Sequence, residues 1–178
     1  MTRTITRSYD HFDDASAVVA RLEAVGIASE NISILSQSGA VDDSNAEEGA
    51  GIGGLAGGAA GLLAGLGMIA IPGIGPIVAA GWLASTAVGA VAGAAVGGLI
   101  GALTSAGVSE RDAHYYAETV RRGGSIVSVR VADVRAAEVE AIMDGAGPID
   151  PVARRAEYER EGWRRFDETT SPSGGPMI

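Results

Sequence analysis

Residues 49–107 read GAGIGGLAGGAAGLLAGLGMIAIPGIGPIVAAGWLASTAVGAVAGAAVGGLIGALTSAG, and this stretch decides how the rest of the chain is interpreted. No ionisable side chain lies between Glu48 and Glu110, and most of the chain's 27 glycines fall in this interval. Many of them recur at every fourth position, which places them on one face of a helix where a second helix can approach closely. The prolines and glycines of Ile71–Pro76 would interrupt such a helix. The stretch therefore predicts a Gly/Ala-rich α-helical hairpin, a glycine zipper. Its predicted helix-packing positions are Gly49, Gly53, Gly57, Gly61, Gly65, Gly89, Gly93, Gly97 and Gly101.

Two environments could compensate for glycine, which costs a helix in water roughly 1 kcal/mol per residue relative to alanine. The predicted arms, Ala50–Ile71 and Ile77–Leu103, each exceed the roughly 20 residues that span a bilayer. Alanine and glycine dominate the first arm, however, and acidic residues precede it where an anchored hairpin usually has a basic border. Insertion in membrane lipid and burial between subunits therefore both stay open.

The overall composition limits the classes of partner. The chain has 178 residues, a net charge of −9 and no cysteine, and all 13 of its basic residues are arginine. This charge disfavours nucleic acid as a partner, and the absence of cysteine excludes thiol chemistry and disulfides. The N-terminus lacks the apolar run of a secretory signal. We expect a cytoplasmic protein, associated with or inserted in the cytoplasmic membrane if the hairpin enters lipid.

The residues before the glycine-rich stretch predict the first half of a small domain, residues 1–36. Thr4–Tyr9 is rich in β-forming residues, and a helical pattern that Asp13 or Asp14 can cap then runs to Gly26. Ile32–Ser36 predicts a second strand, so this half is a β-α-β unit. Residues 37–48 are polar and acidic and predict a linker.

The residues after the stretch, 108–150, predict the second half of the domain. Ser109 with Asp112 forms a capping-box-like start to a helix, and Ser125–Val131 alternates like a half-buried strand. Asp133 begins a further helix. The predicted fold class is α+β, a small ferredoxin-like sheet with helices on one face, interrupted by the helical hairpin. A ferredoxin-like fold needs one more strand after Ser36, for which only residues 39–41 offer themselves.

Several short motifs along the chain, taken together, resemble one known family. They are Tyr9-Asp10 with Phe12 and Ala15, Asn31-Ile32-Ser33-Ile34-Leu35, Gly107-Val108-Ser109-Glu110, and Arg122-Gly123-Gly124-Ser125-Ile126-Val127-Ser128-Val129. In this order, and around a Gly/Ala-rich insert, they resemble the bacterial general stress protein 17M-like, or YflT-like, family. The resemblance implies a non-enzymatic, stress-associated protein whose α+β halves flank a glycine zipper. It implies no catalytic or binding residue.

The residues that could carry chemistry form no recognisable constellation. His11 and His114 are far apart in sequence and have no metal-ligand spacing around them. The acidic cluster of Asp10, Asp13 and Asp14 lies at a strand-to-helix junction, where capping is the common role. We therefore predict no catalytic, cofactor-binding or metal-binding residue, no cofactor and no enzymatic activity.

The tail, residues 151–178, divides into two parts. Residues 152–166 predict a short charged helix with three large aromatic groups, and residues 167–178 are rich in Ser, Pro and Gly and predict disorder. Trp163, Arg164, Arg165 and Phe166 together form a candidate docking motif, because aromatic and arginine side chains often anchor partners. The alternative is a segment that folds back onto its own domain, and both interpretations stay open.

These observations lead to two functional hypotheses. The first is a structural or interaction protein of the stress response that forms homo-oligomers through residues 49–107. The second is a membrane-associated stress protein in which the same residues insert in the cytoplasmic membrane.

Overall fold

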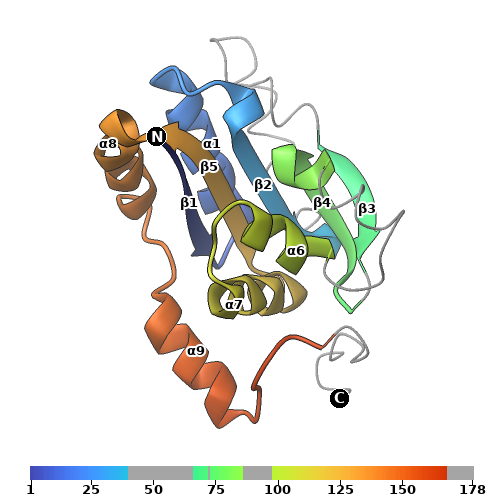
Figure 1. Ribbon diagram of the computed structural model, residues 1–178. Coiled ribbons are helices and arrows are strands. Elements are labelled where there is room, and N and C mark those ends of the chain that lie inside the picture. The colour runs from blue at the N-terminus through green and yellow to red at the C-terminus, as the bar shows by residue number, and fades with distance from the viewer. Residues whose placement is uncertain (40–65, 72, 86–97, 168–178) are drawn as a thin grey trace.

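The computed structural model describes residues 1–39, 66–71, 73–85 and 98–167 (Figure 1). Within these residues the fold is mixed α+β and contains one sheet of five strands. The strands are β1 (Thr2–Tyr9), β2 (Ile32–Gln37), β3 (Gly67–Ile71), β4 (Gly75–Gly81) and β5 (Ser125–Ala132). The helices are α1 (Phe12–Ala24), the 3-10 turn η1 (Ser29–Asn31), α6 (Gly98–Ser105), α7 (Glu110–Arg121), α8 (Asp133–Asp144) and α9 (Pro151–Arg160).

The sheet order is β1-β5-β2-β4-β3, and every neighbouring pair is antiparallel. Helix α1 connects β1 to β2, so the first half of the domain is a β-α-β unit. Strand β5, from the second half, lies between these two strands in the sheet. Ile5 faces Val129 across the β1–β5 pair, and Val129 in turn faces Ile32 of β2. The two halves predicted on either side of the glycine-rich stretch therefore share one sheet.

Helices cover both faces of the sheet, and each face has its own core (Figure 1). On one face α1 and α8 pack against β1 and β5, with Leu22 and Val139 fully buried. On the other face α7 packs against β2 and β5, and α6 packs against α7. The prediction of helices on one face was therefore wrong. Strand β5 shows why: Val127 faces the first core and Ile126 the second, so both faces are buried and not one.

The predicted helical hairpin is wrong for residues 67–71 and 75–81, which form the strands β3 and β4. The turn between them lies where the sequence placed it: the N–H of Ile74 donates to the oxygen of Ile71 over 3.1 Å, and Gly73 has φ +78°. Isoleucine and valine are frequent on both sides of this turn, and β-branched residues fit a pleated sheet better than a helix. Strand β4 pairs with β2, so the strand missing from residues 39–41 comes from inside the glycine-rich stretch. The ferredoxin-like arrangement, with four strands, is not what the described residues form.

The local signals in the two halves agree with the structure. Ser109 is the N-cap of α7, and its hydroxyl oxygen accepts the N–H of Asp112 over 3.1 Å. Helix α8 begins at Asp133 as predicted. The start of α1 differs, because His11 is the N-cap residue and Asp13 and Asp14 lie in the first turn without making a capping hydrogen bond. Their carboxylates still complement the positive end of the helix dipole.

Candidate docking site of the C-terminal segment

The C-terminal segment of the described chain runs along α7 and packs against it (Figure 1). We call α9 and residues 161–167 the strap. Asp150 immediately precedes the strap, and its carboxylate caps α9 by accepting the N–H groups of Val152 and Ala153 over 2.8 and 3.3 Å. Just ahead of it, the N–H of Ile149 donates to the oxygen of Ser8, which attaches the strap to the outer edge of β1.

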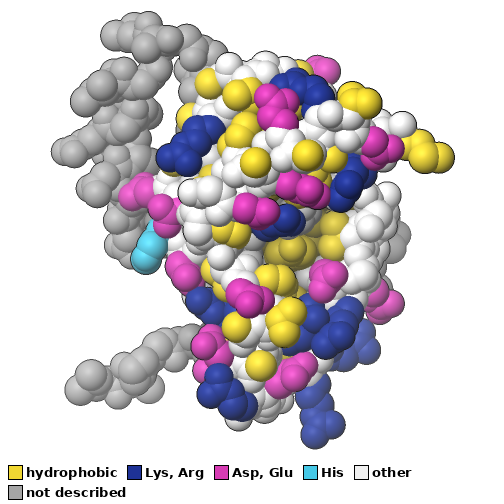
Figure 2. Space-filling model, turned by 90° about the vertical axis from the view of Figure 1, so that its left-hand side faces the viewer, with side chains coloured by type: hydrophobic (Ala, Val, Ile, Leu, Met, Phe, Trp, Pro, Cys, Tyr) yellow, Lys and Arg dark blue, Asp and Glu magenta, His cyan; other side chains and the backbone are white. Residues whose placement is uncertain are grey.

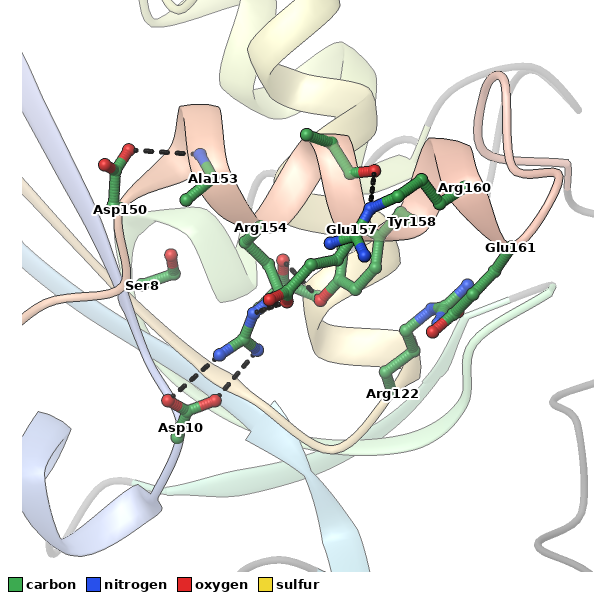
Figure 3. A network of polar contacts seen from close by, with 12 residues as sticks. Ser8, Asp10, Arg122, Asp150, Ala153, Arg154, Glu157, Tyr158, Arg160 and Glu161 are labelled. Carbon is green, nitrogen blue, oxygen red and sulfur yellow. Dashed lines mark hydrogen bonds and ion pairs between the residues drawn. The ribbon is translucent and has the colours of Figure 1, made fainter.

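Three ion pairs connect the strap to the domain. Arg154 donates to both carboxylate oxygens of Asp10 over 2.9 and 3.2 Å, a two-pronged contact visible in Figure 3. Arg155 donates to Asp112 over 2.8 Å, and Arg122 pairs with Glu161. Because most of these side chains are partly exposed, the pairs orient the strap more than they hold it.

The apolar part of the contact is a chain of aromatic rings. Tyr158 lies 6.2 Å from Tyr115 of α7 and 5.9 Å from Trp163, measured between ring centroids. Tyr158 and Phe166 are each only 5% exposed and belong to the same core as α6 and α7. Burial of aromatic area is the larger stabilising contribution here, worth about 1.5–3 kcal/mol for a fully buried ring such as that of Phe166.

Two arginines at the C-terminal end of α7 lie over these rings. The guanidinium of Arg122 lies 4.2 Å from the centroid of Tyr158, and that of Arg121 lies 5.6 Å from the centroid of Phe166. Both arginines form ion pairs with Glu118, whose side chain is fully buried. The Glu118 carboxylate accepts from Arg122 Nε over 2.6 Å and from Arg121 over 2.8 Å. The buried carboxylate thus prepares two cations for cation–π contact with the strap.

Three ionisable groups of the site have shifted pKa values. Burial works to raise the pKa of Asp112, but the hydrogen bonds from Ser109 and Arg155 outweigh it and hold that pKa below its usual range. The hydrogen bond to Asp10 raises the pKa of Arg154, and burial raises the pKa of Tyr115. Each of these shifts moves the pKa of the group further from 7, whereas an efficient general acid or base has a pKa close to the working pH.

The candidate docking residues are divided between the core and the surface. Phe166 is buried and Trp163 is half-buried against the strap's own Tyr158, whereas Arg164 and Arg165 are exposed. The structure therefore places the two aromatic members on their own domain, which was the alternative interpretation of this motif. The partners on α7, above all Glu118, were missed because a glutamate on a helix normally indicates a solvated face.

The other predicted positions contribute little to a site in the part of the chain that the structure describes. Gly101 lies in α6, and a Cβ added there would meet no atom within 4 Å. The other eight helix-packing glycines lie outside the described residues. His11 is exposed, and His114 lies 3.7 Å from Glu110 of its own helix. No group of three potential metal ligands occurs among the described residues.

Comparison with known proteins adds no relative. No protein-family model, curated protein or solved structure matches the chain. The resemblance to YflT-like general stress proteins therefore stays a prediction that rests on the short motifs alone.

Truncation of the strap tests its role in stability. A chain that ends at Gly162 loses Trp163 and Phe166, and we expect its free energy of unfolding to fall by about 2–3 kcal/mol, because a buried aromatic side chain contributes about that much. A chain that ends at Asp167 is the control and should unfold like the full chain, because it retains both rings. Urea titration followed by circular dichroism measures the difference. Equal stability of the two truncated chains would show that residues 163–167 of the strap contribute nothing to the stability of the fold.

Proposed function

We propose that the protein is a non-enzymatic interaction protein that forms homo-oligomers through its glycine-rich segments. The assignment to the bacterial stress response rests on the motif resemblance. Support for self-association comes from how the uncharged stretch joins the folded body. Gly67 pairs with Ala79, so β3 begins at the same end of the hairpin at which β4 ends. Residues 49–65 lead into this end, and residues 86–97 follow Ser85 shortly after it.

This geometry is the observation that carries the proposal. In the sequence, the first run leads into β3 and the second follows β4 after residues 82–85, and together they hold nearly all of the predicted packing glycines. The folded body offers few competing surfaces, because both faces of its sheet are covered and its aromatic side chains are largely buried in its own cores. Runs of small residues let helices approach closely, so these two runs could pack on each other or on the same runs of another copy.

A substitution in the first run tests the proposal. We expect Gly57→Leu to lower the mass of the assembly, because a leucine side chain separates helix faces that glycine allows to touch. Leucine is nevertheless the better helix former by nearly 1 kcal/mol, so a dominant helix propensity would act in the opposite direction. Size-exclusion chromatography with light scattering measures the mass. The matched control is Ala59→Leu, which adds the same side chain two positions away and should leave assembly unchanged.

The second hypothesis is membrane insertion of residues 49–107, and the absence of charged residues from this stretch supports it. The sheet shortens both predicted spans, because residues 67–71 and 77–81 are strands. The part of the first arm that precedes β3, residues 50–66, is shorter than the roughly 20 residues that a bilayer requires. None of the described helices has both the length and the apolar character of a membrane span. Recovery of the protein in carbonate-washed membranes would favour insertion, and recovery as a large particle in the supernatant would favour self-association.

A further inference from the structure

The two edges of the sheet differ in how much of their hydrogen-bonding capacity is used. At the outer edge of β1, the oxygen of Ser8 accepts the backbone N–H of Ile149. The oxygen of Thr6 accepts the hydroxyl of Tyr116 over 3.0 Å. This strand also carries two arginines that pair with α8, and Figure 2, which shows the side of the molecule that is on the left in Figure 1, has a surface of mixed charge. Such an edge resists pairing with another strand.

The opposite edge, β3, has none of these protections among the described residues. Its five residues carry no charge, and its only strand neighbour in the described part of the chain is β4. Met68 is 70% exposed, which is unusual for a large apolar side chain on a strand. An uncharged edge strand with one strand neighbour is a template for another strand.

The register shows which backbone groups of β3 face outward. Ala70 lies opposite Pro76, which has no N–H to donate, and hydrogen-bonded and non-hydrogen-bonded pairs alternate along an antiparallel ladder. Proline fits the non-hydrogen-bonded position, so the Ala70–Pro76 pair and the Met68–Val78 pair are of that kind. The N–H and C=O groups of Met68 and Ala70 then point away from β4, toward the free edge.

We propose that β3 pairs antiparallel with β3 of a second copy of this chain, about a two-fold axis at Ile69, so that the two sheets become one. This inference rests on the proposed self-association and names its surface. Met68 of one copy would lie opposite Ala70 of the other, and the outward groups of both residues would be satisfied. The pairing is self-complementary, as a two-fold interface requires.

Charge favours a second copy as the occupant of this edge. The chain carries a net charge of −9, so two copies repel each other over most of their surfaces. Strand β3 lies inside the interval from Glu48 to Glu110 that has no ionisable residue, and two such strands meet without like-charge contact. The β1 edge resists pairing, because the oxygens of Thr6 and Ser8 already accept hydrogen bonds and two arginines pair with α8 there. Pairing through β3 therefore closes at the dimer and does not continue into a fibre.

The extent of the contact also fits this occupant. A pair of five-residue strands buries less than the roughly 1,200 Å² of a small stable interface, so the edge alone would bind weakly. A partner copy brings with it the same two glycine-rich runs, which join the hairpin next to β3. An unrelated extended peptide would bring no such additional surface.

The first experiment compares masses by light scattering over a range of concentrations. We expect the wild-type chain to be at least dimeric. If it is a dimer, we expect Met68→Lys to have half the wild-type mass, because lysine on an edge strand opposes pairing. Val134→Lys is the control, since Val134 is 92% exposed on α8 and far from β3 in sequence and in the sheet. Met68→Pro removes the outward N–H without adding charge and should also halve the mass. Circular dichroism and the melting temperature show that each variant is folded.

The second experiment tests the register directly and does not depend on weakening the assembly. The chain contains no cysteine, so Ile69→Cys provides a single thiol at the proposed two-fold axis. Directly opposite residues in a non-hydrogen-bonded pair are close enough for a disulfide. We expect Ile69→Cys to form a covalent dimer under mild oxidation, and Val134→Cys to stay monomeric on a denaturing gel.

The outcomes separate the two proposals. A wild-type chain that is monomeric at every concentration overturns the proposed function, and the edge pairing with it. A wild type that assembles, with Met68→Lys and Met68→Pro of the same mass and no cross-link at Ile69→Cys, overturns only the edge pairing. That second result would also be obtained if another segment of the same chain or an unrelated partner occupied the edge.

Discussion

Replacement of Gly81 by alanine is expected to destabilise the protein by about 2–6 kcal/mol. Gly81 has φ +86°, a backbone conformation that costs other residues roughly 1–3 kcal/mol. A Cβ there would also lie 2.0 Å from the oxygen of Ile32 and 2.8 Å from the Cα of Ser33, both on the central strand β2. Because the obstacle is backbone, it cannot rotate away, and overpacking adds typically 1–3 kcal/mol.

The effect of Gly81→Ala should spread beyond the glycine itself. Gly81 ends β4 and turns the chain so that Leu83 is fully buried and its N–H donates to the hydroxyl of Ser33 over 2.9 Å. Gly26→Ala is a matched control, because Gly26 has a similar φ of +80° but no atom within 4 Å of an added Cβ. Urea unfolding measures both. If the two variants lose equal stability, the close approach of β4 to β2 at Gly81 is not a constraint.

The second large effect is expected at Glu118. Glu118→Ala should lower the free energy of unfolding by about 2–4 kcal/mol, because it leaves two guanidinium groups without the carboxylate that holds them. We place the value below the usual 3–5 kcal/mol for a broken buried ion pair because the side chain of Arg122 is 34% exposed and water can solvate it. The strap should also loosen, since Arg121 and Arg122 lose their orientation toward Phe166 and Tyr158.

Two measurements test Glu118→Ala. Chemical unfolding gives the stability, and limited trypsin digestion reports release of the strap through faster cleavage after Arg155, which is buried in the native chain. Glu138→Ala is the control, because Glu138 pairs with Arg135 at the surface of α8 and such pairs contribute under about 1 kcal/mol. Unaltered digestion of Glu118→Ala would show that the buried carboxylate does not position the strap.

Much of the two halves of the domain follows from local signals in the sequence. The strands β1, β2 and β5 and the helices α1, α7 and α8 lie where the alternation of apolar residues and the end signals predicted them, with boundaries shifted by a few residues. Ser109 caps its helix as expected because that hydrogen bond joins residues three positions apart. Interactions of this range are encoded in adjacent residues, so sequence alone is sufficient to find them.

The glycine-rich stretch shows where the same reasoning fails. Residues 67–81 are small and apolar, and a short apolar run fits a buried strand as well as a helix. What decides between them is the free edge of β2, with which β4 pairs. That edge is formed by residues more than thirty positions away, so no local pattern could indicate it.

The strap gives a second example. The sequence singles out Trp163 and Phe166 as a candidate docking motif but offers no information on what they contact. Phe166 lies under Arg121 of α7 and Trp163 against Tyr158, on a side of the domain where Glu118 and Thr119 are both polar and both buried. Local sequence predicts solvent around such residues, because burying an isolated carboxylate is costly. Only the fold shows that two neighbouring arginines and the rings of the strap offset that cost.

The sequence by itself determined the uncharged interval between Glu48 and Glu110, the turn at Ile71–Ile74 and the secondary structure of both halves, because these depend on composition and on contacts between near neighbours. Tertiary structure alone decided that part of the interval completes the sheet as β3 and β4, that helices cover both of its faces, and that the strap binds to α7. The physical reason is that strand pairing and burial depend on which distant segments meet, and the free energy of those contacts exceeds the weak local preferences of small apolar residues.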